Sequence, residues 1–384
     1  MSAARHIAVV TGSRADYGLL LWPIKRILEE PSFKLSVIAT GMHLAAEFGM
    51  TVDQIAADGI AVALRIETLG KGDDATAMAE AIGKGVAGFA HAFDRLRPDL
   101  VLLLGDRYEI FAAAQAAFVK KIPIAHLCGG DVTDGALDDA FRHSISKMAS
   151  LHFPTNADAA RRLRQLGEAE ERIHAVGSTG IDAILRAPLI APSDMEKSLG
   201  HPLPGRFLLA TFHPVTLDAL PSLDQLNELL AALQEIDPAI AIVFTLANAD
   251  ADGRALNAAI DAFATRRPNT FAHASLGPER YLNLMRRAAA VVGNSSSGLY
   301  EAPSFDVPTV NIGRRQDGRL RASSVIDCAP ERAAIGAALQ KALALRPEGT
   351  VNPYGDGAAS ERIVAQLKAI PDWSGLVYKR FQDL

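Results

Sequence analysis

The segment HIAVVTGSRADYGLLLWPIKRILEE, residues 6–30, decides the fold class. Its first six residues form a near-continuous apolar run, which is typical of a strand buried on both faces. Gly12 and Ser13 interrupt the run, and Leu19–Glu30 then reads as a helix. A strand that passes through a short turn into a helix begins a βαβ unit, so the segment predicts a parallel sheet.

The same alternation continues along the chain. In the first half, further strands are predicted at residues 34–39, 61–66, 100–104 and 122–127, with helices near 75–96 and 109–120. The pattern restarts with strands at residues 207–211, 241–245, 270–274, 290–293 and 308–311, and helices near 223–235, 251–265 and 278–288. Two such halves predict an α/β protein with two Rossmann-like parallel-sheet domains that face a cleft.

The boundary between the domains is expected in Pro188–Pro204, a polar segment with four prolines. We predict an N-terminal domain over residues 1–180 and a C-terminal domain over residues 181–355. Residues 356–384 are expected to form a helix and a tail that pack back on the N-terminal domain. A length of 384 residues agrees with two domains, since one domain usually takes ~100–200 residues.

The composition excludes several classes of protein. Hydrophobic residues make up 49% of the chain and the net charge is −5, so the chain is globular and has no basic face for nucleic acid or an anionic membrane. Cys128 and Cys328 are the two cysteines, which argues against a disulfide scaffold or a zinc site. The first strand begins by His6, which leaves no room for a signal peptide, and no apolar run approaches ~18 residues. We therefore expect a cytoplasmic protein without nucleic-acid or membrane partners.

Ligands of open parallel sheets bind beyond the carboxyl ends of the strands, so the loops there are the candidate sites. Residues 12–14 (GSR) offer backbone N–H groups and a cation to an anion, or form an ordinary turn. Residues 106–109 (DRYE) place charged groups at a strand end, although Asp106 could instead cap the next helix. Residues 126–131 (HLCGGD) are either a ligand loop, whose glycines allow close approach, or a buried histidine and a small cysteine.

A helix over residues 137–150 carries two acid–base pairs. Asp138 faces Arg142 and Asp139 faces His143, each at a spacing of four residues. The pairs belong either to the site or to a solvated charged face.

The second half has its own candidates after its strands. His213 follows a strand, and residues 248–254 (NADADGR) contain an Asp-x-Asp that could hold a metal or cap a helix. Residues 293–298 (GNSSSG) gather three hydroxyls at an expected helix start, which suits a phosphate. Glu301 could accept two ribose hydroxyls, and Arg315 could face the same diphosphate.

As a set, these motifs resemble the hydrolysing UDP-N-acetylglucosamine 2-epimerases. The resemblance covers residues 11 to about 319 in family order and rests on TGSRADYGLL (11–20), LGDRYEIFAAA (104–114), HLCGGD (126–131), RHSISKM (142–148), TFHPVT (211–216), NADADGR (248–254) and GNSSSGLYE (293–301). It implies the glycosyltransferase-B fold and the conversion of UDP-N-acetylglucosamine, or of a 2,4-diacetamido-6-deoxy relative, and water into the free manno-configured sugar and the nucleotide diphosphate. That product would feed the biosynthesis of sialic-acid-like nonulosonates.

The motifs and the resemblance together define the candidate site. The candidate catalytic residues are Asp106, Asp131, Cys128 and His213. The candidate substrate-binding residues are Arg14, Asp16, His43, Arg107, His126, Arg142, His143, Asn248, Ser295, Ser296, Ser297, Gly298, Glu301 and Arg315. By the resemblance, Arg14, His213, Ser295, Ser296 and Arg315 would hold the diphosphate, Glu301 the ribose, and His43 would line the sugar site.

One position departs from the family pattern. Many members have a carboxylate where this chain has Cys128, and Asp131 matches a further acidic position. Inversion at C2 needs proton carriers on both faces of the sugar, and we assign Asp106 to one face and Asp131 to the other, with Cys128 as the rival of Asp131.

Other functions remain open at this point. The alternatives are a non-hydrolysing epimerase, a glycosyltransferase of the same fold and a nucleotide-sugar binding protein without turnover. The hydrolysing reaction needs no redox cofactor, and arginines with a helix terminus could replace a metal at the diphosphate. The resemblance favours a homodimer or homotetramer.

Overall fold

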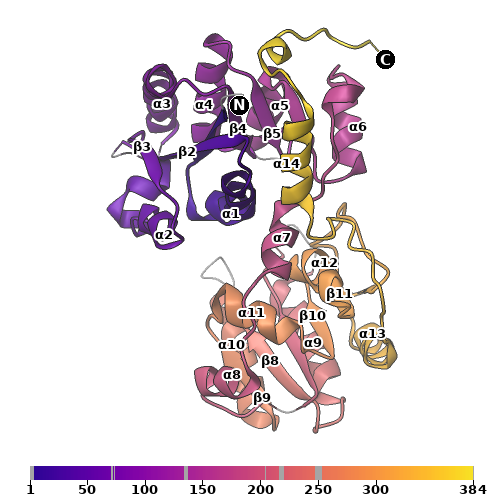
Figure 1. Ribbon diagram of the computed structural model, residues 1–384. Coiled ribbons are helices and arrows are strands. Elements are labelled where there is room, and N and C mark those ends of the chain that lie inside the picture. Colours follow the sequence, from indigo (N-terminus) through magenta and orange to yellow (C-terminus); the bar gives the residue numbers. More distant parts are fainter. Residues whose placement is uncertain are drawn as a thin grey trace. The chain divides into compact units, whose positions relative to one another are not determined.

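The computed structural model describes residues 4–70, 72, 74–133, 137–203, 205–215, 220–246 and 253–383. The chain forms two compact units, which are described separately (Figure 1). Unit 1 comprises Met1–Ala183 and Gly355–Leu384, and unit 2 comprises Ile184–Tyr354. The chain therefore leaves unit 1, forms unit 2 and returns.

Unit 1 is built on a six-stranded sheet in the order β3-β2-β1-β4-β5-β6, and every pairing is parallel. The strands are β1 (Arg5–Thr11), β2 (Phe33–Thr40), β3 (Val62–Ile66), β4 (Leu100–Leu104), β5 (Ile124–Leu127) and β6 (Leu151–Phe153). Successive residues of β1 point to opposite faces, so Ile7 and Val9 enter one apolar cluster and Ala8 and Val10 enter another. Helices cover both faces, which explains why the strand is apolar throughout.

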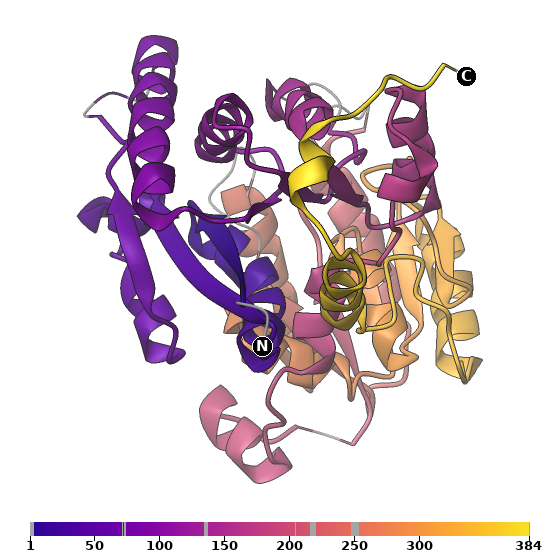
Figure 2. The same ribbon diagram turned by 45° about the horizontal axis from the view of Figure 1, so that its top comes forward.

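The helices of unit 1 follow the predicted alternation. They are α1 (Arg14–Glu29), α2 (Val52–Ala57), α3 (Ala75–Leu96), α4 (Tyr108–Val119), α5 (Leu137–Met148), α6 (Ala157–Gln165) and α14 (Ala359–Ala369), while α7 (Thr179–Leu185) leads into unit 2. In Figures 1 and 2, α14 lies beside the N-terminal part of the chain, where it packs on α1. The carboxylate of Asp182 accepts the first backbone N–H groups of α14, from Ala359 at 3.0 Å and Ser360 at 2.7 Å.

Unit 2 repeats the architecture with a sheet in the order β12-β11-β10-β7-β8-β9, again parallel throughout. Its strands are β7 (Phe207–Thr211), β8 (Ala241–Thr245), β9 (Thr270–His273), β10 (Ala290–Gly293), β11 (Thr309–Ile312) and β12 (Val325–Cys328). Its helices are α8 (Pro192–Leu199), α9 (Ser222–Gln234), α10 (Gly253–Arg266), α11 (Gly277–Met285), α12 (Ser297–Tyr300) and α13 (Arg332–Ala344). The prediction of two Rossmann-like parallel-sheet domains is confirmed.

Three features differ from the sequence predictions. The proline-containing segment 188–204 is not simply a linker, because Pro192 opens helix α8, whose Met195 is fully buried in unit 2. Strands β6 and β12 were not predicted, and they close one edge of each sheet. The serine-rich segment opens a helix of only four residues, α12, and Glu301 is its C-cap residue.

Within the described residues, none of the helices combines the length and the apolar character needed to cross a bilayer.

Candidate functional site

In unit 1, Asp106 lies just beyond the carboxyl end of β4 and pairs with Arg142 of α5. The Nη2 nitrogen of Arg142 donates to Asp106 and, at 3.1 Å, to Thr133 Oγ1. Burial raises the pKa of the Asp106 carboxyl, the positive charge of Arg142 opposes this, and the negative charge of Asp138 adds to it. Asp106 is thus a half-buried carboxyl whose proton affinity is higher than usual, and Asp138 is a nearby acid that our catalytic assignment omitted.

Arg142 also has buried donors that make no hydrogen bond to the described residues. The residue is 8% exposed, and its Nε and Nη1 nitrogens are buried without a hydrogen-bond partner among the described residues. Nη1 lies 3.7 Å from an Asp139 carboxylate oxygen, which is too long for a hydrogen bond. A guanidinium with buried free donors suits an oxygen-bearing ligand.

His126 does not offer a free ring nitrogen. It is fully buried; its Nε2 lies 2.7 Å from the carbonyl oxygen of Gly105 and its Nδ1 lies 3.1 Å from Ser146 Oγ. Burial lowers the pKa of His126 to about 3, so the ring is neutral and Nε2 is the nitrogen that donates to the carbonyl. Its role is to hold the backbone immediately before Asp106.

The two glycines after Cys128 allow two helices to approach the backbone closely, a role that the sequence prediction did not include. A Cβ on Gly129 would lie 2.8 Å from Ser146 Oγ of α5, and one on Gly130 would lie 2.2 Å from the carbonyl oxygen of Ala159 in α6. Both positions therefore exclude larger residues because helices approach the backbone closely.

Cys128 and Asp131 occupy different surroundings. Burial raises the pKa of the Cys128 thiol well above its usual range, so it stays protonated, and it packs against the apolar core. Since the thiolate is the reactive form of cysteine, this environment favours Asp131 over Cys128 as the second proton carrier, and the role of Cys128 stays a prediction. Asp131 accepts from Thr155 Oγ1 at 2.9 and 3.2 Å, and burial raises its pKa.

A second group of charges lies where β1, β2 and β4 end. Arg107 donates to both carboxylate oxygens of Glu109, at 3.0 and 3.2 Å. Burial raises the pKa of Asp16 to about 6, opposed by the charge of Arg107. A Cβ on Gly12 would lie 3.5 Å from both the Asp16 and Glu109 carboxyl groups, so these two acids flank one point of the backbone.

The other candidates of unit 1 differ in access. His43 is fully buried, with Nε2 3.0 Å from Thr11 Oγ1 and Nδ1 2.8 Å from Thr51 Oγ1, and burial lowers its pKa to about 4. His43 therefore connects the end of β1, at Thr11, to Thr51, and has no ring nitrogen left for a ligand. Arg14 is exposed at the first residue of α1, and His143 Nε2 lies 3.4 Å from Asp139.

Unit 2 has a pocket of about 370 Å³ at the carboxyl ends of its strands. Hydroxyl, carboxyl and imidazole groups of Thr211, His213, Ser295, Ser296, Ser297 and Glu301 line it, together with Tyr281 of α11 and apolar residues of the β8 and β9 loops. Burial raises the pKa of Glu301 to about 7. Sequence reasoning missed Tyr281, because sixteen residues separate it from the serine it contacts.

Asn294 organises one wall of this pocket. Its side chain accepts from the backbone N–H of His213 at 2.7 Å and donates to the His213 carbonyl at 2.9 Å. Arg315 and Gln316 both donate to the Asn294 carbonyl, at 3.2 and 2.8 Å. The structure thus brings His213, Arg315 and the serine segment together.

Two further candidates are Gly298 and Asn248. Gly298 is buried, and a Cβ there would lie 2.5 Å from the methyl group of Thr309. The absence of a side chain therefore allows strand β11 to pack closely against α12. Asn248 lies outside the described residues. Among the residues that the structure describes, no group of three or more His, Cys, Asp or Glu could hold a metal ion.

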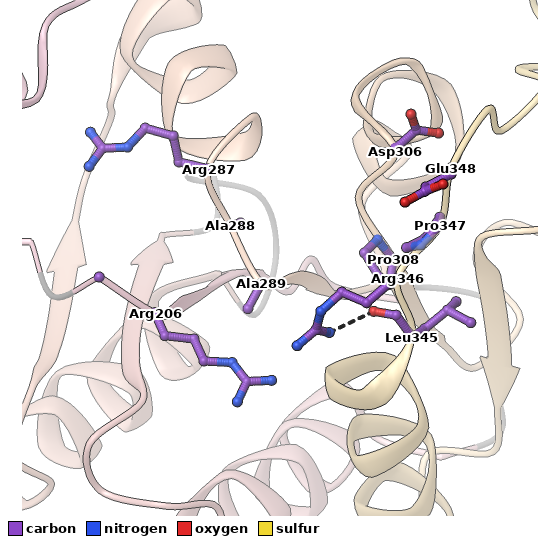
Figure 3. Close-up of a pocket in the computed structure, with 11 residues that line it drawn as sticks. Arg206, Arg287, Ala288, Ala289, Asp306, Pro308, Leu345, Arg346, Pro347 and Glu348 are labelled. Carbon is purple, nitrogen blue, oxygen red and sulfur yellow. Dashed lines mark hydrogen bonds between the residues drawn. The ribbon is translucent and has the colours of Figure 1, made fainter.

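Figure 3 shows another hollow of unit 2, of about 380 Å³, where β7, β10 and β11 begin. Arg206 and Arg346 point toward each other there, and Arg346 donates to the Leu345 carbonyl at 2.8 Å. Both arginines also donate to the Leu343 carbonyl, at 2.7 and 2.9 Å. Cations at the carbonyls of a helix end stabilise that end, so these arginines cap α13. We therefore place the candidate site of unit 2 in the pocket at the carboxyl ends.

Comparison with known proteins identifies relatives. The model of the UDP-N-acetylglucosamine 2-epimerase family matches residues 25–368. The chain is 38% identical to the GDP/UDP-N,N'-diacetylbacillosamine 2-epimerase (hydrolyzing) of Campylobacter jejuni, over 84% of each chain. It is 35% identical to the UDP-N,N'-diacetylbacillosamine 2-epimerase (hydrolyzing) of Legionella pneumophila, over 98% of each. These matches confirm the resemblance that the motifs indicated.

A solved structure supports the fold. The UDP-GlcNAc 2-epimerase of Neisseria meningitidis bound to UDP-GlcNAc superposes with a TM-score of 0.80 at 19% identity, over 95% of this chain and all of that one.

Proposed function

Because this chain belongs to the UDP-N-acetylglucosamine 2-epimerase family, we propose that it hydrolyses a UDP-linked 2-acetamido sugar with inversion at C2. The products are UDP and the free manno-configured sugar. A 2,4-diacetamido-6-deoxy sugar is the preferred substrate, because the two relatives at 38% and 35% identity are named for N,N'-diacetylbacillosamine. The free sugar would feed nonulosonate biosynthesis.

The pocket of unit 2 is the single observation that supports nucleotide binding most directly. Its hydroxyls at Ser295 and Ser296 suit the diphosphate oxygens, and its apolar residues suit the base. Glu301 at the pocket suits the two ribose hydroxyls. His213 and Arg315 lie beside the same serine segment through Asn294 and supply further polar and positive groups.

The carboxyls of unit 1 suit the proton transfers. If the anomeric C–O bond breaks first, the oxocarbenium-like centre makes the C2 proton acidic, and nearby carboxylates stabilise the charge. A base then removes the proton to give a glycal, an acid returns a proton to the opposite face, and water adds at C1. The overall reaction is redox-neutral.

Asp106 and Asp131 are our candidates for the two proton carriers. Burial raises the pKa of both carboxyls, which brings them closer to the neutral range in which a group can both take and give a proton. Arg142 holds Asp106 and retains donors for a substrate oxygen. Asp138 is the alternative to Asp131, because its charge reaches Asp106.

The test is turnover in deuterated water. The protein is incubated with UDP-N-acetylglucosamine, with UDP-N,N'-diacetylbacillosamine and with the GDP form of the latter, and products are identified by NMR. The proposal expects free manno-configured sugar with deuterium at C2. Release of nucleotide without deuterium at C2 excludes it, and a nucleotide-bound manno isomer identifies a non-hydrolysing epimerase. Tight nucleotide binding without any product indicates a binding protein.

A cytoplasmic location, expected from the two unpaired cysteines, and a homodimer or homotetramer, expected from the family resemblance, also belong to this proposal. Light scattering of the purified protein tests the oligomer, and a monomeric mass under turnover conditions rejects it.

A further inference from the structure

A chain of hydroxyl groups runs beneath the serine segment of unit 2. Tyr281 Oη lies 2.6 Å from Ser297 Oγ, and Ser297 Oγ lies 3.1 Å from Ser295 Oγ. Tyr281 also hydrogen-bonds Thr211, whose hydroxyl bonds that of Thr245. The chain therefore links β7, β8 and α11 to the loop after β10.

The geometry determines the direction in which protons are donated. A hydroxyl has one proton and can accept from two donors. Ser297 donates its proton to Ser295, so Tyr281 must donate to Ser297. Ser295 also accepts from the backbone N–H of Ser297 at 3.4 Å. Its own proton is therefore left for an acceptor in the pocket that it lines.

We propose that Tyr281 is a positioning residue that orders the serine hydroxyls, so that Ser295 presents its O–H to a phosphate oxygen of the nucleotide. This inference rests on the proposed function, which assigns the diphosphate to this pocket. A chain of hydrogen bonds polarises its members in one direction, so the last hydroxyl is a stronger donor than an isolated serine.

A tyrosine suits the start of such a chain. Burial raises the pKa of Tyr281, and the negative charge of Glu301 adds to this. The phenol consequently remains protonated, and hence a donor, throughout the physiological pH range. Ser297 is buried and Ser295 is half-buried. The direction of donation is therefore fixed by groups inside the protein, and Ser295 is the member of the chain that can donate to a ligand in the pocket.

The decisive variant is Tyr281→Phe, which removes the hydroxyl and keeps the ring. Calorimetry with UDP, UMP and uridine should show UDP and UMP binding weakened by about 2- to 10-fold, the range of one hydrogen bond, and uridine binding unchanged. A merely structural role would weaken all three ligands equally and would overturn the proposal. The matched control is Tyr378→Phe, an exposed tyrosine of the C-terminal segment.

A double-mutant cycle tests the order of the chain. If Tyr281 acts through Ser297, the loss from Tyr281→Phe should disappear in a Ser297→Ala background. Additive losses would contradict the relay. Should Tyr281→Phe fail to fold, Ser297→Ala alone interrupts the same chain and should weaken UDP but not uridine.

Binding of inorganic pyrophosphate, measured beside binding of UDP, distinguishes a failure of this proposal from a failure of the proposed function. If the protein binds pyrophosphate but not UDP, the nucleotide assignment fails, and weakening of pyrophosphate binding by Tyr281→Phe still supports the relay. If UDP binds and Tyr281→Phe changes nothing, the relay alone fails. If neither ligand binds, both are overturned.

Discussion

Replacing Glu168 with glutamine should destabilise unit 1, and the effect should depend on pH. Glu168 is buried, with 3% of its surface exposed. Its carboxylate accepts hydrogen bonds from His152 Nε2 at 3.0 Å, Lys147 Nζ at 2.8 Å and Lys379 Nζ at 2.6 Å. Burial alone would raise its pKa, but these three hydrogen bonds outweigh burial and lower the pKa from 4.5 to about 2.

The size of the effect follows from that shift. A displacement from 4.5 to about 2 corresponds to about 3 kcal/mol, because one pKa unit is worth about 1.4 kcal/mol. Since the folded pKa is depressed, this stabilisation is present above pH 4.5 and is lost as pH falls through about 2. The side chain of Lys147 is 43% exposed, so solvent screens its interaction with Glu168. The value of about 3 kcal/mol is therefore an upper limit on the stabilisation.

The assay can be confined to unit 1. Both tryptophans of the chain, Trp22 and Trp373, lie in unit 1, so their fluorescence during urea unfolding reports that unit. Glu168→Gln should lower the free energy of unfolding by up to about 3 kcal/mol at pH 7, and the gap to the unaltered protein should close as pH falls from 4.5 to 2. Glu170→Gln, at an exposed ion pair with Arg164, is the matched control and should leave the midpoint unchanged. The reasoning would be refuted if Glu168→Gln left the urea midpoint at pH 7 unaltered. It would also be refuted if the difference in unfolding free energy between the two proteins did not change with pH.

Four further results are expected. Asp106→Asn should lower turnover by ~10²-fold or more while UDP affinity stays within error by calorimetry, and near-normal turnover rejects a proton-carrying role. Cys128→Ser should retain turnover, and iodoacetamide should label Cys128 slowly at pH 8 because burial raises its pKa; rapid labelling counts against this. If the ionised Glu301 carboxylate binds ribose, uridine affinity should rise as pH increases through about 7, and Glu301→Gln should abolish the dependence. Gly293→Ala should destabilise unit 2 strongly in thermal melts, since its Cβ would lie 1.9 Å from the Thr211 carbonyl oxygen; an unchanged melting temperature contradicts this.

The sequence predicted the longer strands because residues such as Ile7 and Ala8 serve opposite apolar faces and leave no polar position. It could not predict β6, whose three residues are too few for a periodic signal. Helix α8 was overlooked because Pro192 marks a helix start as readily as a linker.

Within the site, position along the chain predicted that Asp106 and the serine segment lie at strand ends. It could not predict partners that come from distant elements. The contact of Tyr281 with Ser297, the burial of His126 and His43, and the packing role of Gly130 all depend on tertiary approach.

The return of α14 to unit 1 has a consequence during synthesis on the ribosome. Ile363, Leu367 and Trp373 belong to the same apolar cluster as Ile7 and Val9 of the first strand. The core of unit 1 is therefore complete only after residues 355–384 have been synthesised, whereas unit 2 is continuous and has its whole sequence earlier. Loss of the last thirty or so residues, by an early stop codon or by proteolysis, would expose an unfinished interior at the other end of the polypeptide.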